Sequence, residues 1–325
     1  MKIILLVFLL YSCFSLEYSN VYYQNQFGNY QSLFNKKYSG LELQYRLQVF
    51  SKNLDFINNE NKKNHTYLLG FTSLTDLTNE EYQQSKLCGC AAPKPNEYLR
   101  KTQATSIHRS LPESIDWREK GAVNPIRDQG DCGSCWAFAA VASIEGAHFQ
   151  STGELLSLSP QQLVDCDPSS YGCESGLVEY AFRYIISNKG ICSEEDYPYT
   201  AVTGTCNDKK CKPATSISSF SIVPRWSGES MLTAISERVV SLGIASRSDV
   251  FQHYSSGILD SEDCGTNISH YVAAVGYGEE NGKKYFIIRN TYGENWGEKG
   301  YIRLAYTEEG MGMCGIYIDG KYPIM

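Results

Sequence analysis

The sequence predicts an α+β protein in which helices come first and strands follow. Apolar residues recur at helical spacing between residues 41 and 61, and helix signals continue to about residue 187. After about residue 222, short runs rich in β-branched and aromatic residues indicate strands. Because helices and strands are separated along the chain, we expect two halves with a cleft between them.

Composition limits the classes of protein that fit. A chain of 325 residues with 42% hydrophobic residues can bury one sizeable core or two modest ones. Its net charge of −7 provides no basic surface for a phosphate backbone, so we expect no nucleic-acid partner.

The first 15 residues have the pattern of a secretory signal peptide. Met1 and Lys2 precede an apolar run over residues 3–10 that is too short to span a bilayer, and Ser12 and Ser15 mark the expected cleavage region. No later stretch approaches the roughly 18 consecutive apolar residues of a membrane helix, so no membrane association is expected. We therefore expect a protein of the secretory pathway, either secreted or held in a lysosome-like vesicle, where disulfides persist.

An amphipathic helix is expected between residues 41 and 61. Its apolar stripe consists of Leu43, Leu47, Phe50, Leu54 and Ile57. Glu42 and Arg46 lie one turn apart and can form an ion pair. Residues 88–109 are rich in Pro, Lys, Thr and Ala without periodicity, which is typical of a linker that proteases can reach.

From residue 111 the chain is expected to form helices and then a hairpin. Ser134 can cap a helix that runs to about His148, and further helices are indicated near residues 159–163 and 176–187. Strands are expected at residues 271–277, 285–289 and 300–304. Asn281-Gly282 is a strong signal for a tight turn between the first two strands.

Cys132 and Cys135 are separated by two small residues, and three kinds of site use that spacing. A zinc site lacks further ligands, because the five histidines form no closely spaced pair. A thioredoxin-like redox pair lacks the surrounding alternation of strands and helices. Nine cysteines follow residue 110, an odd number that two purely structural cysteines leave unexplained. A nucleophilic Cys135 beside a disulfide-bonded Cys132 accounts for that number.

Cys135 stands at the predicted start of a helix, where exposed N–H groups favour the thiolate form. A thiolate nucleophile needs a base and a group that orients the base. His270 and Asn290 come at the far ends of the two hairpin strands and are expected to meet there. Which face each side chain takes stays open, because a one-residue slip in register reverses it.

Gln129 precedes Cys135 by six residues and completes the predicted site. Its side-chain amide can donate to the oxygen that becomes negative when a thiolate attacks a carbonyl, beside the backbone N–H of Cys135. The other histidines are less well placed, and we expect His253 to lie in a polar loop.

Three segments carry a resemblance to a known family. QGDCGSCWAF (129–138), SHYVAAVGYG (269–278) and RNTYGENWGEKGYIRL (289–304) resemble the cysteine, histidine and asparagine motifs of the papain family of cysteine peptidases. The resemblance extends over about residues 22–323 and is closest to the cathepsin L-like group. It implies a papain-like two-domain fold, with a helical left domain over about residues 111–221 and a β-barrel-like right domain over about residues 222–325.

The same resemblance implies a zymogen with a helical inhibitory propeptide over residues 16–110, cleaved before Leu111. The family's propeptide signature is matched at Glu42, Arg46, Phe50, Asn53, Ile57 and Asn61, and a looser second motif is matched at Gly70, Thr72, Leu74 and Asp76. The implied activity is that of a cysteine endopeptidase that needs no metal and no cofactor. Its implied partners are protein and peptide substrates, its own propeptide and cystatin-like inhibitors, and the protein is expected to be a monomer.

Disulfide pairs also follow from the resemblance. It implies bridges between Cys132 and Cys173, between Cys166 and Cys206, and between Cys264 and Cys314. Cys192 and Cys211 then remain, and we predict a fourth bridge between them.

The resemblance further implies where substrate binds. Gly176 would pair with the extended substrate, and the S2 pocket would be formed by Leu177, Val178, Gly243 and Ile268, with Asp319 at its base. Because a carboxylate can bind a guanidinium through two hydrogen bonds, we predict a preference for Arg at P2.

Three features depart from the family pattern or bear on modification. Tyr292, which we also count among the substrate-binding residues, replaces the Trp that usually covers the bond between the catalytic Asn and His, and this predicts weaker shielding. Glu174 and Ser175 replace the residues that usually precede Gly176 and alter the rim of the substrate site. Asn64 and Asn267 begin glycosylation sequons, and we expect the second to stay bare because it lies beside His270.

Overall fold

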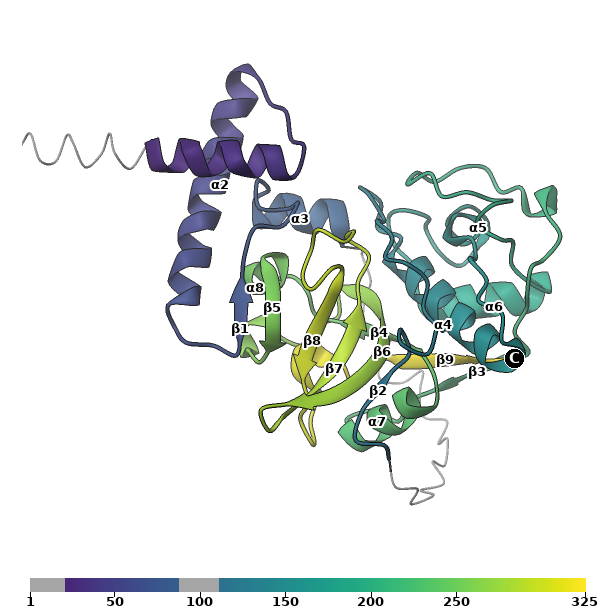
Figure 1. Cartoon of the computed structure of the whole chain (residues 1–325). Coiled ribbons are helices and arrows are strands. Elements are labelled where there is room, and N and C mark those ends of the chain that lie inside the picture. Colours follow the sequence, from purple (N-terminus) through teal and green to yellow (C-terminus); the bar gives the residue numbers. More distant parts are fainter. Residues whose placement is uncertain (1–20, 88–110) are drawn as a thin grey trace, which may run out of the picture.

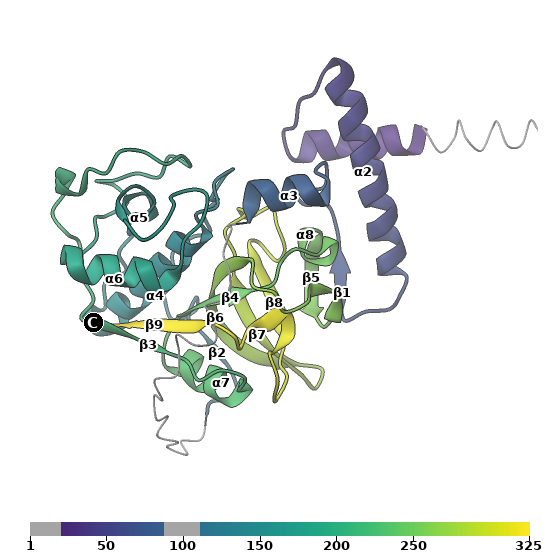
Figure 2. The same ribbon diagram turned by 180° about the vertical axis from the view of Figure 1, so that it is seen from behind.

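The structure, a computed structural model, describes residues 21–87, called here the N-terminal segment, and residues 111–325, called the C-terminal segment. The expected signal peptide, the linker, Cys13, Cys88, Cys90 and His108 lie outside the described residues. Helices α4, α5 and α6 gather on one side of the C-terminal segment, and the sheet lies on the other (Figure 1). The helices of the N-terminal segment stand at the end of the sheet, as the view from behind also shows (Figure 2).

The predicted order of helices and then strands holds only in outline, because short strands at residues 67–69 and 115–116 precede the helix at 135–152, and helices at 228–237 and 249–252 lie between later strands. Residues 21–33 are helical. The later helices are α2 (Gly40–Asn61), α3 (Asn79–Lys86), α4 (Cys135–Thr152), α5 (Pro160–Cys166), α6 (Val178–Asn188), α7 (Gly228–Glu237) and α8 (Asp249–Gln252), with short 3-10 turns η2 (Asp208–Lys210), η3 (Glu262–Cys264) and η4 (Met313–Gly315). The strands are β1 (Tyr67–Leu69), β2 (Ile115–Asp116), β3 (Ser219–Ile222), β4 (Val240–Ile244), β5 (Tyr254–Leu259), β6 (His270–Glu280), β7 (Lys283–Arg289), β8 (Tyr301–Ala305) and β9 (Gly320–Ile324).

The described strands form one mixed sheet. Its order is β1-β5-β8-β7-β6-β4-β9-β3, and β2 pairs with β6. Only β5 and β8 run parallel among these pairs. The three predicted strands are confirmed as β6, β7 and β8. The turn between β6 and β7 is formed by Asn281 and Gly282, which have φ values of 51° and 77°, the backbone that Asn-Gly favours.

Two clusters of buried apolar residues support the C-terminal segment. The larger lies within the sheet and under α7, and the smaller joins α4, α5 and α6. Ile115 and Trp117 belong to the larger cluster, although they precede all the helices of the smaller one, and the Trp117 indole donates to the Ile235 carbonyl at 2.8 Å. The chain therefore crosses between the two halves at its start and again at its end, where β9 runs toward α4 (Figure 1).

The N-terminal segment has a small core of its own, formed by Phe27, Tyr30, Phe50 and Leu54. The predicted helix stripe is buried from Phe50 onward, but Leu43 is exposed because the first turns of α2 extend past this core. Strand β1 leaves this segment and joins the sheet edge, where Tyr67 lies opposite Gly257 of β5. No helix within the two described ranges is long and apolar enough to span a bilayer.

Candidate active site

Cys135 is the first residue of α4 and is fully buried. It is the only cysteine in the described residues that forms no disulfide. Ser134 precedes the helix as expected, but its side chain does not cap it; the hydroxyl instead contacts the Tyr199 hydroxyl at 2.6 Å. The thiol therefore stands at the N-terminus of an 18-residue helix, and no side-chain cap uses the first N–H groups of that helix.

Four disulfides hold loops of the C-terminal segment, and one of them, Cys132–Cys173, lies just before this helix start. They join Cys132 to Cys173, Cys166 to Cys206, Cys192 to Cys211 and Cys264 to Cys314, the pairs that the sequence analysis expects. The Gly133 amide also donates to the Cys173 carbonyl at 2.7 Å. The loop before Cys135 is therefore fixed both covalently and through its backbone.

His270 and Asn290 meet at the end of the β6–β7 hairpin. His270 Nε2 lies 2.7 Å from Asn290 Oδ1, and both side chains are fully buried. Because an amide oxygen only accepts, Nε2 carries the hydrogen and Nδ1 is left as the basic nitrogen. Among the described residues, His270 Nδ1 has no hydrogen-bond partner. Burial lowers the pKa of His270 to about 4, although the bond to Asn290 opposes part of that shift.

Tyr292 covers this pair from one side. Its ring lies 5.0 Å from the His270 ring and 5.6 Å from the Trp296 ring, and it is almost completely buried. Burial raises the pKa of Tyr292 well above its ordinary value. The weaker shielding that the sequence predicts is not visible here, because the N-terminal segment adds Tyr82 to the same cluster of rings.

Gln129 is fully buried, and its side-chain amide is fixed on both sides. Its oxygen accepts from the Thr291 hydroxyl at 2.5 Å, and its nitrogen donates to the Cys132 carbonyl at 2.8 Å. The same nitrogen donates at 2.8 Å to the carbonyl of Lys86, the last residue of α3. A peptide carbonyl of the N-terminal segment thus already lies at the amide expected to bind a substrate oxyanion.

The Lys86 side chain strengthens that contact. Its ammonium donates to the Gly130 carbonyl at 2.8 Å and lies within 3.7 Å of carboxylates of Asp128 and Asp131. Sequence reasoning missed Lys86, and the only available signal was its position just before the expected linker. The end of α3 is therefore attached to the loop that precedes Cys135.

Helix α3 also contacts the sheet beside His270. The Tyr82 hydroxyl donates to the Ser246 carbonyl at 2.7 Å, and Asn79 donates to the Arg247 carbonyl at 2.9 Å. Tyr82 is fully buried in this interface. The N-terminal segment therefore covers the neighbourhood of Cys135, His270 and Asn290.

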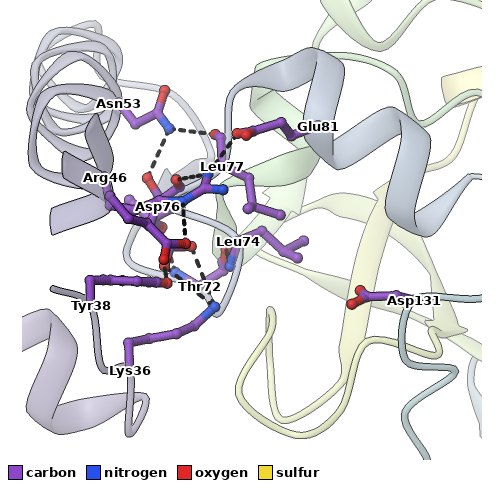
Figure 3. A network of polar contacts seen from close by, with 12 residues as sticks. Lys36, Tyr38, Arg46, Asn53, Thr72, Leu74, Asp76, Leu77, Glu81 and Asp131 are labelled. Atoms are coloured by element: carbon purple, nitrogen blue, oxygen red, sulfur yellow. Dashed lines mark hydrogen bonds and ion pairs between the residues drawn. The ribbon is translucent and has the colours of Figure 1, made fainter. Parts of the chain in front are cut away.

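A polar network explains the signature residues of the N-terminal segment (Figure 3). The Asp76 carboxylate is fully buried, accepts from the Tyr38 hydroxyl and lies 3.4 Å from the Lys36 ammonium. Arg46 donates to the Asp76 carbonyl at 3.0 Å and pairs with Glu81 at 2.8 Å. This network joins the loop before α3 to α2.

The asparagines of the same signature bind backbone. Asn53 donates to the carbonyls of Thr75 and Leu77, and Asn61 makes two 2.9 Å bonds with the backbone of Leu69. Glu42 lies 3.9 Å from Arg46, so the predicted ion pair is the weakest part of this arrangement. Helix α2 thereby holds β1 through Asn61 and the loop before α3 through Asn53.

The predicted substrate residues of the helical side lie beside Cys135. A Cβ on Gly176 would be 2.3 Å from the Trp136 ring, so only glycine lets this backbone approach so closely. Leu177 precedes α6 and Val178 begins it, and both pack in the cluster that contains Cys135.

The predicted S2 residues of the sheet side also converge. A Cβ on Gly243 would lie 2.8 Å from Ile268 and 3.5 Å from the Asp319 Cβ. The Asp319 carboxylate, however, is not open to a substrate cation. It accepts from the Tyr271 hydroxyl at 2.9 Å and forms an ion pair with the buried ammonium of Lys321. The expected preference for Arg at P2 therefore loses its physical basis, because Lys321 and Tyr271 already bind the carboxylate that was expected to bind the arginine. The sequence analysis did not identify Lys321.

His253 differs from the sequence prediction of a polar loop. It follows α8, is fully buried, and lies between the sheet and the N-terminal segment. Its Nδ1 is 3.5 Å from the Thr75 hydroxyl, its ring is 6.3 Å from the Phe56 ring, and its Nε2 has no hydrogen-bond partner among the described residues. Burial lowers the pKa of His253 to about 3.

In the described part of the chain, no cluster of three His, Cys, Asp or Glu side chains could hold a metal ion. The residues described above provide a thiol at the start of α4, an imidazole bonded to an amide at the end of the β6–β7 hairpin, and a second amide in the loop before Cys135. These are groups for nucleophilic and acid–base chemistry.

Comparisons with known proteins agree with this geometry. The model of papain family cysteine proteases matches residues 111–324, and that of the cathepsin propeptide inhibitor domain (I29) matches residues 27–82. Cysteine proteinase RD21A of Arabidopsis thaliana is 46% identical over 290 residues, which is 87% of this chain but only 62% of that relative. Germination-specific cysteine protease 1 of the same plant is 46% identical over 86% of this chain and 77% of its own length.

Solved structures are similar over nearly the whole chain. The recombinant stem bromelain precursor has a TM-score of 0.86 at 37% identity and covers 93% of this chain and 99% of its own. Digestive procathepsin L 3 of Tenebrio molitor larval midgut has a TM-score of 0.80 at 31% identity, with coverages of 93% and 99%. The chain described here belongs to the papain family of cysteine proteases and carries the cathepsin-type inhibitory propeptide of that family.

Proposed function

We propose that this chain is the zymogen of a cysteine endopeptidase that hydrolyses peptide bonds through Cys135, His270 and Asn290. The observation that carries the proposal is the 2.7 Å bond between His270 Nε2 and Asn290 Oδ1, which leaves Nδ1 as the basic nitrogen. A base oriented in this way is what a thiol nucleophile needs.

The proposed reaction has two stages. Cys135 gives its proton to Nδ1 of His270 and, as a thiolate, attacks the scissile carbonyl, while the Gln129 amide and the Cys135 N–H stabilise the oxyanion. The imidazolium of His270 gives its proton to the leaving amine as the C–N bond breaks. Water, deprotonated by His270, then attacks the acyl-enzyme and releases the acid and the free thiol. Asn290 keeps the imidazole in the required tautomer.

We propose that the N-terminal segment inhibits by occupying the site. The Lys86 carbonyl accepts from Gln129 at 2.8 Å, so a substrate carbonyl cannot reach this amide while α3 is docked.

In this proposal residues 16–110 form the propeptide, and cleavage before Leu111 releases the peptidase. Residues 111–221 and 222–325 are mainly its left and right domains. Peptides and proteins are the proposed substrates, and cystatin-like proteins are proposed inhibitors of the monomeric enzyme.

The proposed localisation follows from the four disulfides and from residues 1–15. Disulfides persist in oxidising compartments, so a secreted or lysosome-like, vesicular protein is proposed. Of the two sequon asparagines, both are exposed, but Ser269 of the second sequon is fully buried and contacts the Ser246 hydroxyl. A glycan is therefore proposed at Asn64 and not at Asn267.

Active-site titration tests the proposal. The full chain, processed at acid pH, is expected to take one equivalent of an epoxysuccinyl inhibitor and to hydrolyse peptide reporters, and Cys135→Ala is expected to do neither. A chain that binds peptides without cleaving them would instead be a non-catalytic member of the family, for which the replacement of Trp by Tyr292 is the only sequence argument. Insulin reduction that is lost in Cys132→Ser would indicate a redox role.

A further inference from the structure

Asp319 is placed where the S2 pocket of the proposed peptidase should end. The Gly243 N–H donates to the Asp319 carbonyl at 2.9 Å, and Gly243 lies opposite Tyr271 in the β4–β6 pairing. A Cβ on Gly243 would touch Ile268, Tyr271 and Asp319 at 2.8, 3.4 and 3.5 Å. Three elements that are distant in sequence thus meet around this carboxylate.

Both oxygens of the Asp319 carboxylate are already in use. Oδ2 accepts from the Tyr271 hydroxyl at 2.9 Å, and Oδ1 pairs with the Lys321 ammonium. The side chains of Lys321 and Asp319 have relative exposures of 2% and 0%. A guanidinium binds a carboxylate most strongly through both oxygens, and here each oxygen has its own donor.

The strand geometry explains why Lys321 reaches Asp319. Asp319 immediately precedes β9 and Lys321 is the second residue of that strand, and the ion pair between them shows that their side chains lie on the same side of the chain. Gly320 lies between them, and a Cβ there would point toward Met231 and Val223, at 2.9 and 3.2 Å. Strand β9 is held in this register because Lys321 pairs with Ser241 and Gly320 with Leu242 of β4.

We propose that Lys321 is a specificity-determining residue, whose ammonium occupies the position that a P2 arginine would take at Asp319. The inference rests on the proposed peptidase function. Because the Lys321 ammonium neutralises the Asp319 carboxylate, the S2 pocket accepts uncharged and above all apolar P2 side chains.

Exchange of the two cations is unfavourable for a physical reason. A P2 arginine that displaced Lys321 would leave a buried ammonium without its counterion, and an arginine beside the intact pair would face a like charge. An apolar P2 side chain would meet Ile268, which lies beside Gly243, and it brings no charge that could displace either member of the ion pair. The pocket therefore discriminates against arginine although it contains an acid.

Steady-state hydrolysis of Phe-Arg and Arg-Arg dipeptidyl coumarin reporters tests the proposal, with rates expressed per titrated thiol. The wild-type enzyme is expected to prefer Phe-Arg across pH 5 to 7. Lys321→Met, which keeps the length of the side chain, is expected to raise the Arg-Arg to Phe-Arg ratio of kcat/KM by about tenfold or more. The double variant Lys321→Met with Asp319→Asn, which has no charge at either position, is expected to return the ratio to the wild-type value or below.

Two outcomes would overturn the proposal. One is a wild-type enzyme that cleaves Arg-Arg at least as well as Phe-Arg, and this measurement holds even where Lys321→Met fails to fold. The other is a Lys321→Met enzyme that titrates normally and keeps the wild-type ratio. Failure of the proposed function is a separate result, because a wild-type protein that takes no epoxysuccinyl inhibitor and cleaves neither reporter would show it.

Discussion

Tyr82 of the propeptide and Tyr292 of the peptidase lie edge to face, with ring centroids 6.1 Å apart and hydroxyl oxygens 3.4 Å apart. Tyr292 also lies 5.0 Å from the His270 ring. A single aromatic side chain therefore connects the inhibitory helix to the proposed catalytic imidazole. In the zymogen, Tyr82 supplies cover for a site in which Tyr replaces the family's usual Trp.

Truncation of Tyr82 should loosen the zymogen. Tyr82→Ala removes a fully buried ring and should cost the docked state roughly 3–5 kcal/mol. Tyr82→Phe keeps the ring and loses the bond to the Ser246 carbonyl and the weaker contact with the Tyr292 hydroxyl, and it should cost about 1 kcal/mol. The half-time of autoprocessing at a fixed acid pH should shorten in the same order. Tyr22→Phe, at an exposed position, is the matched control. Equal half-times for Tyr82→Ala and wild type would contradict this prediction.

His253 should make docking of the propeptide sensitive to pH. Burial alone lowers its pKa to about 3, compared with an ordinary value of about 6.5. The docked state therefore binds fewer protons than the released state between these values. We expect docking to be at full strength above pH 6.5 and to weaken as pH falls, by at most about 1.4 kcal/mol for each pH unit down to about pH 3.

Replacement of His253 by Leu should therefore move the pH at which processing becomes fast to a lower value. The measurement is the rate of autoprocessing of the full chain between pH 4 and 7. His148→Gln, on α4 and bonded to Thr215, is the control and should keep the wild-type profile. Superimposable profiles for His253→Leu and wild type would show that this imidazole does not contribute.

Gln129 should contribute to catalysis more than to folding. Gln129→Ala removes the side-chain donor proposed for the oxyanion, and kcat should fall by about 10²–10³ with little change in KM. Gln162→Ala is the matched control, because Gln162 is also a buried amide with two bonds, to the Cys192 N–H and the Tyr184 hydroxyl. Per titrated thiol, Gln162→Ala should keep the wild-type kcat. Similar kcat losses in both variants would assign Gln129 a structural role only.

The bridge between Cys192 and Cys211 should act mainly on stability. It closes a short loop with a sequence separation of 19 residues. Replacement of both cysteines by Ser should cost about 2–4 kcal/mol and lower the Tm of the mature enzyme by roughly 5–10 °C. A thiol titration of unfolded, unreduced mature wild type should find one thiol, at Cys135. More than one thiol, or an unchanged Tm in the variant, would contradict the assignment.

The hairpin that carries His270 and Asn290 could be predicted from local signals, but the face of the hairpin to which each side chain points could not. Asn281-Gly282 marks the turn, and the strand composition marks both arms. The pairing shifts between Ala274 and Gly276, so Val275 is an extra residue in β6. A bulge of this kind reverses the facing of every residue beyond it, and no local pattern announces it.

Contacts between elements that are distant along the chain also could not be predicted from local sequence patterns. The sequence predicts Asp319 at the S2 pocket, and its partner Lys321 is only two residues further along the chain, but the burial of the pair depends on the pairing of β9 with β4, which is non-local. The sequence predicts His253 in a polar loop, yet Thr75 and Phe56, which lie 178 and 197 residues earlier in the chain, pack against it. Burial by a distant segment leaves no trace in a local pattern.

Strand β1 occupies the edge of the peptidase sheet, where Thr66 and Ile258 exchange two hydrogen bonds across a separation of 192 residues. Strand β1 precedes the other described strands of the sheet along the chain, and Asn61 and Leu69 bond it to α2. We therefore expect β1 to be available as a pairing edge when β5 is synthesised. In the proposed maturation, loss of the propeptide exposes the N–H of Ile258 and the carbonyl of His253, so a mature enzyme that unfolds would have to refold without this edge strand.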